Sequence, residues 1–149
     1  MIKKSTKETR PIFAKAQSQL SKTANTASRL TQWPCKIKLV PINAPYFDEA
    51  DLLIAADCAA YAYAGFHEDF MKNKVTLIGC PKLFDGDYAE KLTAIITNNN
   101  IKSITLAILE TACCKEMESA VRRAIQASKK TLPLNTVIIT TNGKILNDI

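Results

Sequence analysis

The chain has 149 residues, of which 47 % are hydrophobic and 23 % are charged. This is the composition of a globular protein, and the length suffices for one domain with a buried core. No apolar run is long enough to cross a bilayer, and the basic residues 1–10 are not followed by the apolar core of a signal peptide. We therefore expect a cytoplasmic protein with reduced thiols and no membrane contact.

The positive charge is concentrated near the N-terminus. Residues 1–38 hold nine lysines and arginines against Glu8, a net charge of +8, so the total of +6 leaves residues 39–149 at −2. We expect residues 1–31 to form a basic tail with a weak helix over residues 12–31, and residues 32–149 to form the α/β domain. The tail is either simply solvated or binds an acidic protein partner. Nucleic acid is not expected, because no aromatic residues interleave the charges.

Five apolar runs bounded by turn-forming residues predict strands. In chain order they are Cys35–Val40, Asp51–Ala56, Lys74–Ile78, Ser103–Leu109 and Thr136–Thr141. Between them, apolar residues at helical spacing predict helices. These lie within Ala59–Asn73, Tyr88–Asn98 and Lys115–Lys129.

Strands that alternate with helices indicate an α/β fold. The strands are continuously apolar, which is typical of parallel strands covered on both faces. We therefore expect a three-layer, mostly parallel sheet of about five strands, either Rossmann-like or flavodoxin-like. Asn142-Gly143 is a hairpin turn signal, and it would return Lys144–Leu146 as a short antiparallel edge strand.

Four of the five cysteines, Cys58, Cys80, Cys113 and Cys114, follow the C-terminal ends of predicted strands. In an open parallel sheet this edge forms the ligand-binding crevice, and neighbouring strands lie about 4.8 Å apart. Several thiolates at one edge suit Zn²⁺ or an iron–sulfur cluster. His67 could add a nitrogen ligand. The sequence thus predicts a metal site made of these four cysteines and His67, although no CxxC pair is present.

Other roles for these residues stay open at this point. Cysteine often fills a core, and for Cys35 this is the favoured interpretation. A thiol of Cys58 or Cys80, activated by a helix N-terminus and assisted by His67, would instead make a cysteine-dependent enzyme. The chain could also be a non-catalytic interaction module or form a homo-oligomer. Asp57 and Glu110, near strand ends, either orient a ligand or cap backbone N–H groups.

Several common sites are missing from the sequence. It has no GxGxxG and no GxxxxGK[ST] motif, so nucleotide binding lacks support. It has no GxSxG elbow and a single histidine, which argues against serine-hydrolase chemistry. The Cys-x-Asp-x-Arg and His-x-x-Cys pattern of zinc carbonic anhydrases on parallel sheets is not present either.

Longer motifs resemble a known family. They are Trp33-Pro34, Leu39 to Phe47, Ala50 to Cys58, Phe66 to Phe70, Leu77 to Leu83, Ile101 to Thr105 and Cys113-Cys114. With them, residues 30–146 resemble the C-terminal domain of ferredoxin-type 4Fe–4S proteins of anaerobic bacteria and archaea. The resemblance implies the α/β domain with its own cysteine edge, in a family whose members are described as iron–sulfur-binding. Under the metal-binding hypothesis, the domain would serve a redox role or dock to a protein partner such as a redox protein. This chain lacks the CxxCxxCxxxC repeats of the longer relatives, and Lys115-Glu116 replaces their glycine-rich continuation, so the ferredoxin clusters themselves are not implied.

Overall fold

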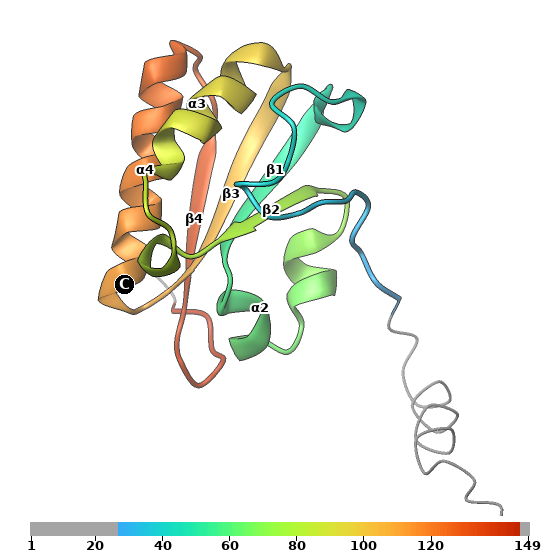
Figure 1. Ribbon diagram of the computed structural model, residues 1–149. Helices are drawn as coiled ribbons and strands as arrows, with labels where there is room; N and C mark the ends of the chain where they lie inside the picture. Colours follow the sequence, from blue (N-terminus) through green and yellow to red (C-terminus); the bar gives the residue numbers. More distant parts are fainter. Residues whose placement is uncertain (1–26, 147–149) are drawn as a thin grey trace, which may run out of the picture.

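The computed structural model describes residues 27–146 of the chain (Figure 1). Its centre is a four-stranded sheet with the strand order β2-β1-β3-β4, in which every neighbouring pair is parallel. The strands are β1 (Ala50–Ala56), β2 (Val75–Gly79), β3 (Ile101–Leu109) and β4 (Leu134–Ile139). The prediction of an α/β fold built on a parallel sheet is therefore confirmed.

Strand β1 forms the centre of the core. The side chains from Leu52 to Ala55 are completely buried. Because successive side chains point to opposite faces of a sheet, both faces of β1 must be covered. Ile54 pairs with Leu77 of β2 on one side and with Leu106 of β3 on the other, and both partners are also fully buried. Burial on both faces explains why the sequence is continuously apolar here rather than alternating.

Two long helices lie side by side over one face of the sheet (Figure 1). Helix α3 (Tyr88–Asn98) begins at Asp87, whose carboxylate accepts the N–H of Ala89 at 2.9 Å and so caps the helix. Helix α4 (Ala112–Ser128) ends at Lys129, which adopts the left-handed conformation common at helix ends. Both predicted helices are confirmed, and α4 begins three residues earlier than its apolar spacing indicates.

Short helical segments complete the connections. They are η1 (Pro45–Phe47), α2 (Ala59–Ala62), the π-helical η2 (His67–Met71) and η3 (Pro81–Leu83). The helix expected within Ala59–Asn73 is thus divided in two. Gly65 lies in the break, so close to the Asp69 carboxylate that a side chain there would overlap it. No helix of residues 27–146 is long and apolar enough to cross a membrane.

Two predicted strands are wrong. In Cys35–Val40 only Lys36 forms a strand-like bridge, to Ile78, and the chain then turns because the N–H groups of Leu39 and Val40 both donate to the Lys36 carbonyl. The expected edge strand Lys144–Leu146 is reduced to one antiparallel bridge between Ile139 and Ile145. The sheet therefore has four strands instead of about five. Most of the helix expected over residues 12–31 lies outside the described residues, and residues 27–31 are not helical.

A side chain closes the outer edge of β2. The buried amide of Gln32 donates to the Thr76 carbonyl and accepts the Thr76 N–H at 3.4 Å, so one side chain takes the place of a neighbouring strand. Three residues later the backbone itself continues this pairing. Ile78 donates to the Cys35 carbonyl at 2.8 Å, and Ile37 donates to the Ile78 carbonyl at 2.9 Å. Residues 32–37 therefore cover the outer edge of β2.

Replacing Gln32 by alanine should destabilise the protein by about 1–3 kcal/mol, since the buried N–H and C=O of Thr76 would lose their partner. Urea unfolding followed by circular dichroism measures this change. Gln126→Ala is the matched control, because Gln126 is exposed on α4 and should tolerate the change within about 0.5 kcal/mol. Equal stability of both variants would show that the amide does not contribute.

Candidate functional site

Four of the five cysteines lie at the C-terminal edge of the sheet, as the strand pattern predicts. Cys58 follows β1, Cys80 follows β2, and Cys113 and Cys114 lie in the first turn of α4, directly after β3. These three strands are neighbours in the order β2-β1-β3, so their ends are adjacent in space. The chain passes from β1 to β2 on one side and then to β3 on the other side. The crevice between the ends of β1 and β3 is therefore the switch point where ligands bind in such sheets.

Cys58 and Cys80 differ in their surroundings. Cys58 is exposed at the start of α2, a four-residue helix that contacts β1 and β3. Cys80 is half-buried, and its N–H donates to the Tyr88 hydroxyl at 3.1 Å. Gly79 makes room for this contact, because a side chain there would overlap the Tyr88 ring. Burial raises the pKa of Tyr88, so its hydroxyl stays protonated.

Cys113 and Cys114 are neighbours in sequence with different accessibility. Cys113 is half-buried, and its sulfur lies 3.3 Å from the hydroxyl oxygen of Thr111, the residue before α4. Cys114 is buried in the core. Burial raises the pKa of the Cys114 thiol, although hydrogen bonding to Thr111 and to the Leu109 backbone partly opposes the shift. Of the pair, Cys113 is therefore the residue that a ligand can reach.

Two carboxylates accompany the cysteines. Asp57 forms an ion pair with Lys36 through one oxygen, while its other oxygen is buried without a hydrogen-bond partner in the described part of the chain. The hydrogen bond from Lys36 to this carboxylate raises the lysine's pKa. Glu110 instead accepts the N–H of Thr141 at 3.0 Å and thereby holds the turn after β4. Of the two roles considered for Glu110, the structure thus shows backbone capping. Asp57 forms its ion pair with Lys36 and leaves one buried oxygen without a partner among the described residues.

These side chains do not form a ready metal site. Among residues 27–146, no three histidine, cysteine, aspartate or glutamate side chains are grouped closely enough to hold a metal ion. The fold brings the cysteine-bearing loops to one edge, but in this arrangement it does not bring the sulfur atoms of Cys58, Cys80 and Cys113 together as a ligand set. Metal binding by these residues therefore stays a prediction.

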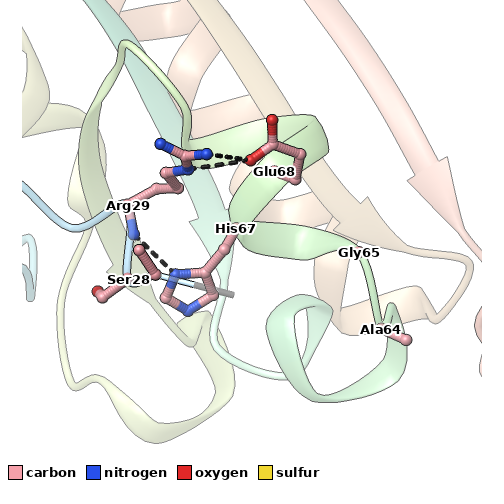
Figure 2. A pocket seen from close by; sticks show the side chains of 7 residues that line it. Ser28, Arg29, Ala64, Gly65, His67 and Glu68 are labelled. Carbon is pink, nitrogen blue, oxygen red and sulfur yellow. Dashed lines mark hydrogen bonds and ion pairs between the residues drawn. The ribbon is translucent and has the colours of Figure 1, made fainter. Parts of the chain in front are cut away.

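His67 lies in a separate cavity of about 550 Å³ (Figure 2). This cavity is lined by Ala27, Ser28, Arg29, Ala64, Gly65, His67 and Glu68, and none of these is a cysteine. The backbone N–H of Arg29 donates to Nδ1 of His67 at 3.1 Å. A histidine that accepts through Nδ1 carries its proton on Nε2, so His67 can donate a hydrogen bond only from that nitrogen.

The cavity also contains a charge network that the sequence pattern does not indicate. The guanidinium of Arg29 donates to Glu68 Oε2 at 2.9 and 2.7 Å (Figure 2). Lys72 donates to Oε1 of the same carboxylate at 2.6 Å. These two cations lower the pKa of Glu68. Lys72 lies one helical turn from Glu68, a spacing that can be found in the sequence. Arg29 is 39 residues away, and nothing local in the sequence signals this contact.

Comparison with known proteins supports the fold and leaves the activity open. A family described as a Rossmann-like domain matches residues 44–149. A protein of the archaeon Archaeoglobus fulgidus, described as uncharacterised, is 30 % identical over 115 residues, which cover 76 % of this chain and 81 % of the relative. No solved structure matches the chain.

The four thiols at the C-terminal edge should react with iodoacetamide in the order of their exposure. We expect Cys58 to be alkylated first, Cys80 and Cys113 later, and Cys114 only after unfolding, because the reactive thiolate must be both accessible and formed. Peptide mass spectrometry after timed labelling at neutral pH measures the order. Early labelling of Cys114 would show that the first turn of α4 opens in solution.

Cys114 should also make stability depend on pH. The pKa of Cys114 is raised in the folded protein, so its contribution to the free energy of unfolding is fully present below the ordinary cysteine pKa of about 8.5. As the pH rises above that value, the unfolded chain loses the proton while the folded thiol keeps it. The contribution to stability therefore decreases. We expect Cys114→Ala to weaken the decline in unfolding free energy between pH 7.5 and 9. Equal slopes for the wild type and Cys114→Ala would contradict this assignment.

Proposed function

This chain belongs to the family of Rossmann-like domains, and we propose that it binds a thiophilic metal, as Zn²⁺ or an iron–sulfur cluster, at the C-terminal edge of its sheet. The ligands would be Cys58, Cys80 and Cys113, one from each of three adjacent strand ends. The proposed role is redox chemistry or docking to a redox partner. The resemblance to the C-terminal domain of ferredoxin-type proteins supports an iron–sulfur role in an anaerobe.

One observation carries this proposal. Three neighbouring parallel strands are each followed, within a few residues, by an exposed or half-buried cysteine, and the edge they share is the one at which such sheets bind ligands. A cysteine that only fills a core would be buried, as Cys114 is. Cys58 is exposed and Cys80 and Cys113 are half-buried, so core filling does not explain their position.

The ligand-free arrangement requires the loops to move before three sulfurs can share a metal. Cys58 and Cys80 precede the short segments α2 and η3, of four and three residues, which have few internal hydrogen bonds to break. Cys113 lies on the 17-residue helix α4 and is the more firmly placed ligand. We therefore expect the first two loops to close toward Cys113 on binding. The binding free energy would include the cost of that closure.

Exposed apolar side chains beside two of the cysteines support partner docking. Tyr61, three residues after Cys58, is 94 % exposed, and Leu83, three residues after Cys80, is 86 % exposed. Aromatic and large aliphatic residues of this kind frequently anchor protein interfaces. A partner that contacted both loops would lie directly over the thiols.

A nucleophilic thiol is the second candidate function, and the position of Cys113 favours it. Cys113 is the second residue of a long helix, where free backbone N–H groups stabilise negative charge. Thr111 contacts its sulfur and could orient it. His67 would not be the general base in this case, because it lies in the separate cavity with Arg29. The base would have to come from the substrate or from another residue of the edge.

Anaerobic titration with Zn²⁺, and reconstitution with iron and sulfide, separate the two candidates. We expect one metal site per chain. Cys58→Ala, Cys80→Ala and Cys113→Ala should each weaken Zn²⁺ binding by at least roughly 10–100-fold, because the loss of a residue that only supports a metal ligand already reduces affinity by that factor. Cys35→Ala is the control, since Cys35 is not among the proposed ligands.

Two results would overturn the metal-binding function. One is the absence of stoichiometric binding of Zn²⁺ or of a cluster. The other is binding that none of the three substitutions weakens. If binding is absent while Cys113 alone is alkylated rapidly near neutral pH, the nucleophilic function takes its place.

A further inference from the structure

The hydroxyl of Tyr88 continues the cover over the outer edge of β2 to the first residue beyond the strand. Gln32 satisfies the outward backbone groups of Thr76, and the segment behind it pairs with Ile78. Because outward groups recur at every second residue of a strand, the next outward residue is Cys80. There the Tyr88 hydroxyl accepts the N–H at 3.1 Å and donates to the carbonyl at 3.4 Å. One phenol thus takes the place of a neighbouring strand at a cysteine.

The Tyr88 side chain is itself firmly placed. It is only 7 % exposed, in the first turn of α3, and its ring stacks on that of Phe84 with 4.5 Å between the ring centroids and 14° between the ring planes. Gly79 leaves the space that the ring and the hydroxyl occupy, because a Cβ atom added there would lie 2.7 Å from the hydroxyl oxygen. Packing therefore holds the hydroxyl against the backbone of Cys80.

The loop that begins at Cys80 has few other attachments. Pro81 has no backbone N–H, so the ladder between β1 and β2 cannot continue past Cys80. Leu83 donates to the Cys80 carbonyl at 3.2 Å, but this bond lies within the loop and can move with it. Within the described part of the chain, the Tyr88 hydroxyl is therefore the one hydrogen-bond connection from the Cys80 backbone to a different part of the fold.

We propose that Tyr88 is a positioning residue that latches Cys80 in its ligand-free place. This inference rests on the proposed metal-binding function, in which the loop after β2 closes toward Cys113. Closure takes Cys80 out of line with β2, so both hydrogen bonds to the hydroxyl break and the Cys80 N–H needs another partner. The latch thus opposes metal binding. It keeps this thiol at the edge of the sheet until a bound metal compensates for the lost bonds.

Timed alkylation of the full chain tests the latch without any metal. Tyr88→Phe removes the hydroxyl and keeps the ring that stacks on Phe84. We expect iodoacetamide to label Cys80 on the order of tenfold faster in this variant, because the loop opens more often once its hydrogen bonds are lost. Cys58 and Cys114 should react as in the wild type. Unchanged labelling of the buried Cys114 shows that the effect is confined to the loop.

Anaerobic titration with Zn²⁺ tests whether the latch opposes closure. The dissociation constant of Tyr88→Phe should be on the order of tenfold lower than that of the wild type, because closure no longer breaks the bonds to the hydroxyl. Gly79→Ala is an independent variant, since its methyl group would displace the ring, and it should change labelling and affinity in the same direction. Tyr46→Phe is the matched control. It removes a buried hydroxyl in η1 that has no hydrogen-bond partner among the described residues. Circular dichroism of each variant establishes that it is folded.

The results separate the latch from the metal-binding function. If Zn²⁺ binds through the cysteines but Tyr88→Phe binds it equally or more weakly, the function stands and the latch is wrong. Labelling of Cys80 at the wild-type rate in both Tyr88→Phe and Gly79→Ala would also overturn the latch. If no form binds Zn²⁺ while the labelling of Cys80 accelerates as expected, the metal-binding function fails and Tyr88 still holds the thiol in place.

Discussion

The parallel pairing of β1 with neighbours on both sides is the constraint on which the rest of the structure depends. A strand between two parallel partners must be apolar on both faces, and the run from Leu52 to Ala55 meets this requirement without interruption. Parallel strands also cannot be joined by tight turns, so each must be followed by a connection that crosses the sheet. The connections after β1, β2 and β3 therefore all leave from one edge, and this is where the cysteines are found.

The elements that were predicted correctly are those fixed by local chemistry. An apolar run buried on both faces, such as β1 or β3, has few alternatives, and the apolar spacing of α3 and α4 defines a helix without reference to the rest of the chain. The errors occurred where tertiary contacts decide. Ile37 and Val40 are buried and apolar like strand residues, yet the backbone between them turns and leaves Leu39 66 % exposed. The sequence of Cys35–Val40 does not distinguish a strand from a turn that buries the same two side chains.

The candidate site, too, could be predicted only in part from the sequence. The location of Cys58, Cys80 and Cys113 at one edge follows from the strand pattern, because the C-terminal ends of neighbouring parallel strands must be adjacent. The place of His67 could not be inferred, since it depends on the contact between Arg29 and the start of η2, 38 residues later in the chain. Likewise, only the burial of Cys114 in the core distinguishes it from Cys113. The topology of the sheet thus determines which residues share an edge, whereas side-chain packing determines which of their atoms are in contact.

The cover that Gln32 places over β2 also limits how large an assembly this sheet can form. A sheet with two open edges can add copies at both ends, and such growth leads to fibres. Here one amide side chain satisfies both backbone groups of Thr76, and the segment behind it blocks the same edge. Growth of a sheet across many molecules requires both of its edges to be open. A single glutamine side chain therefore prevents such growth at the β2 edge.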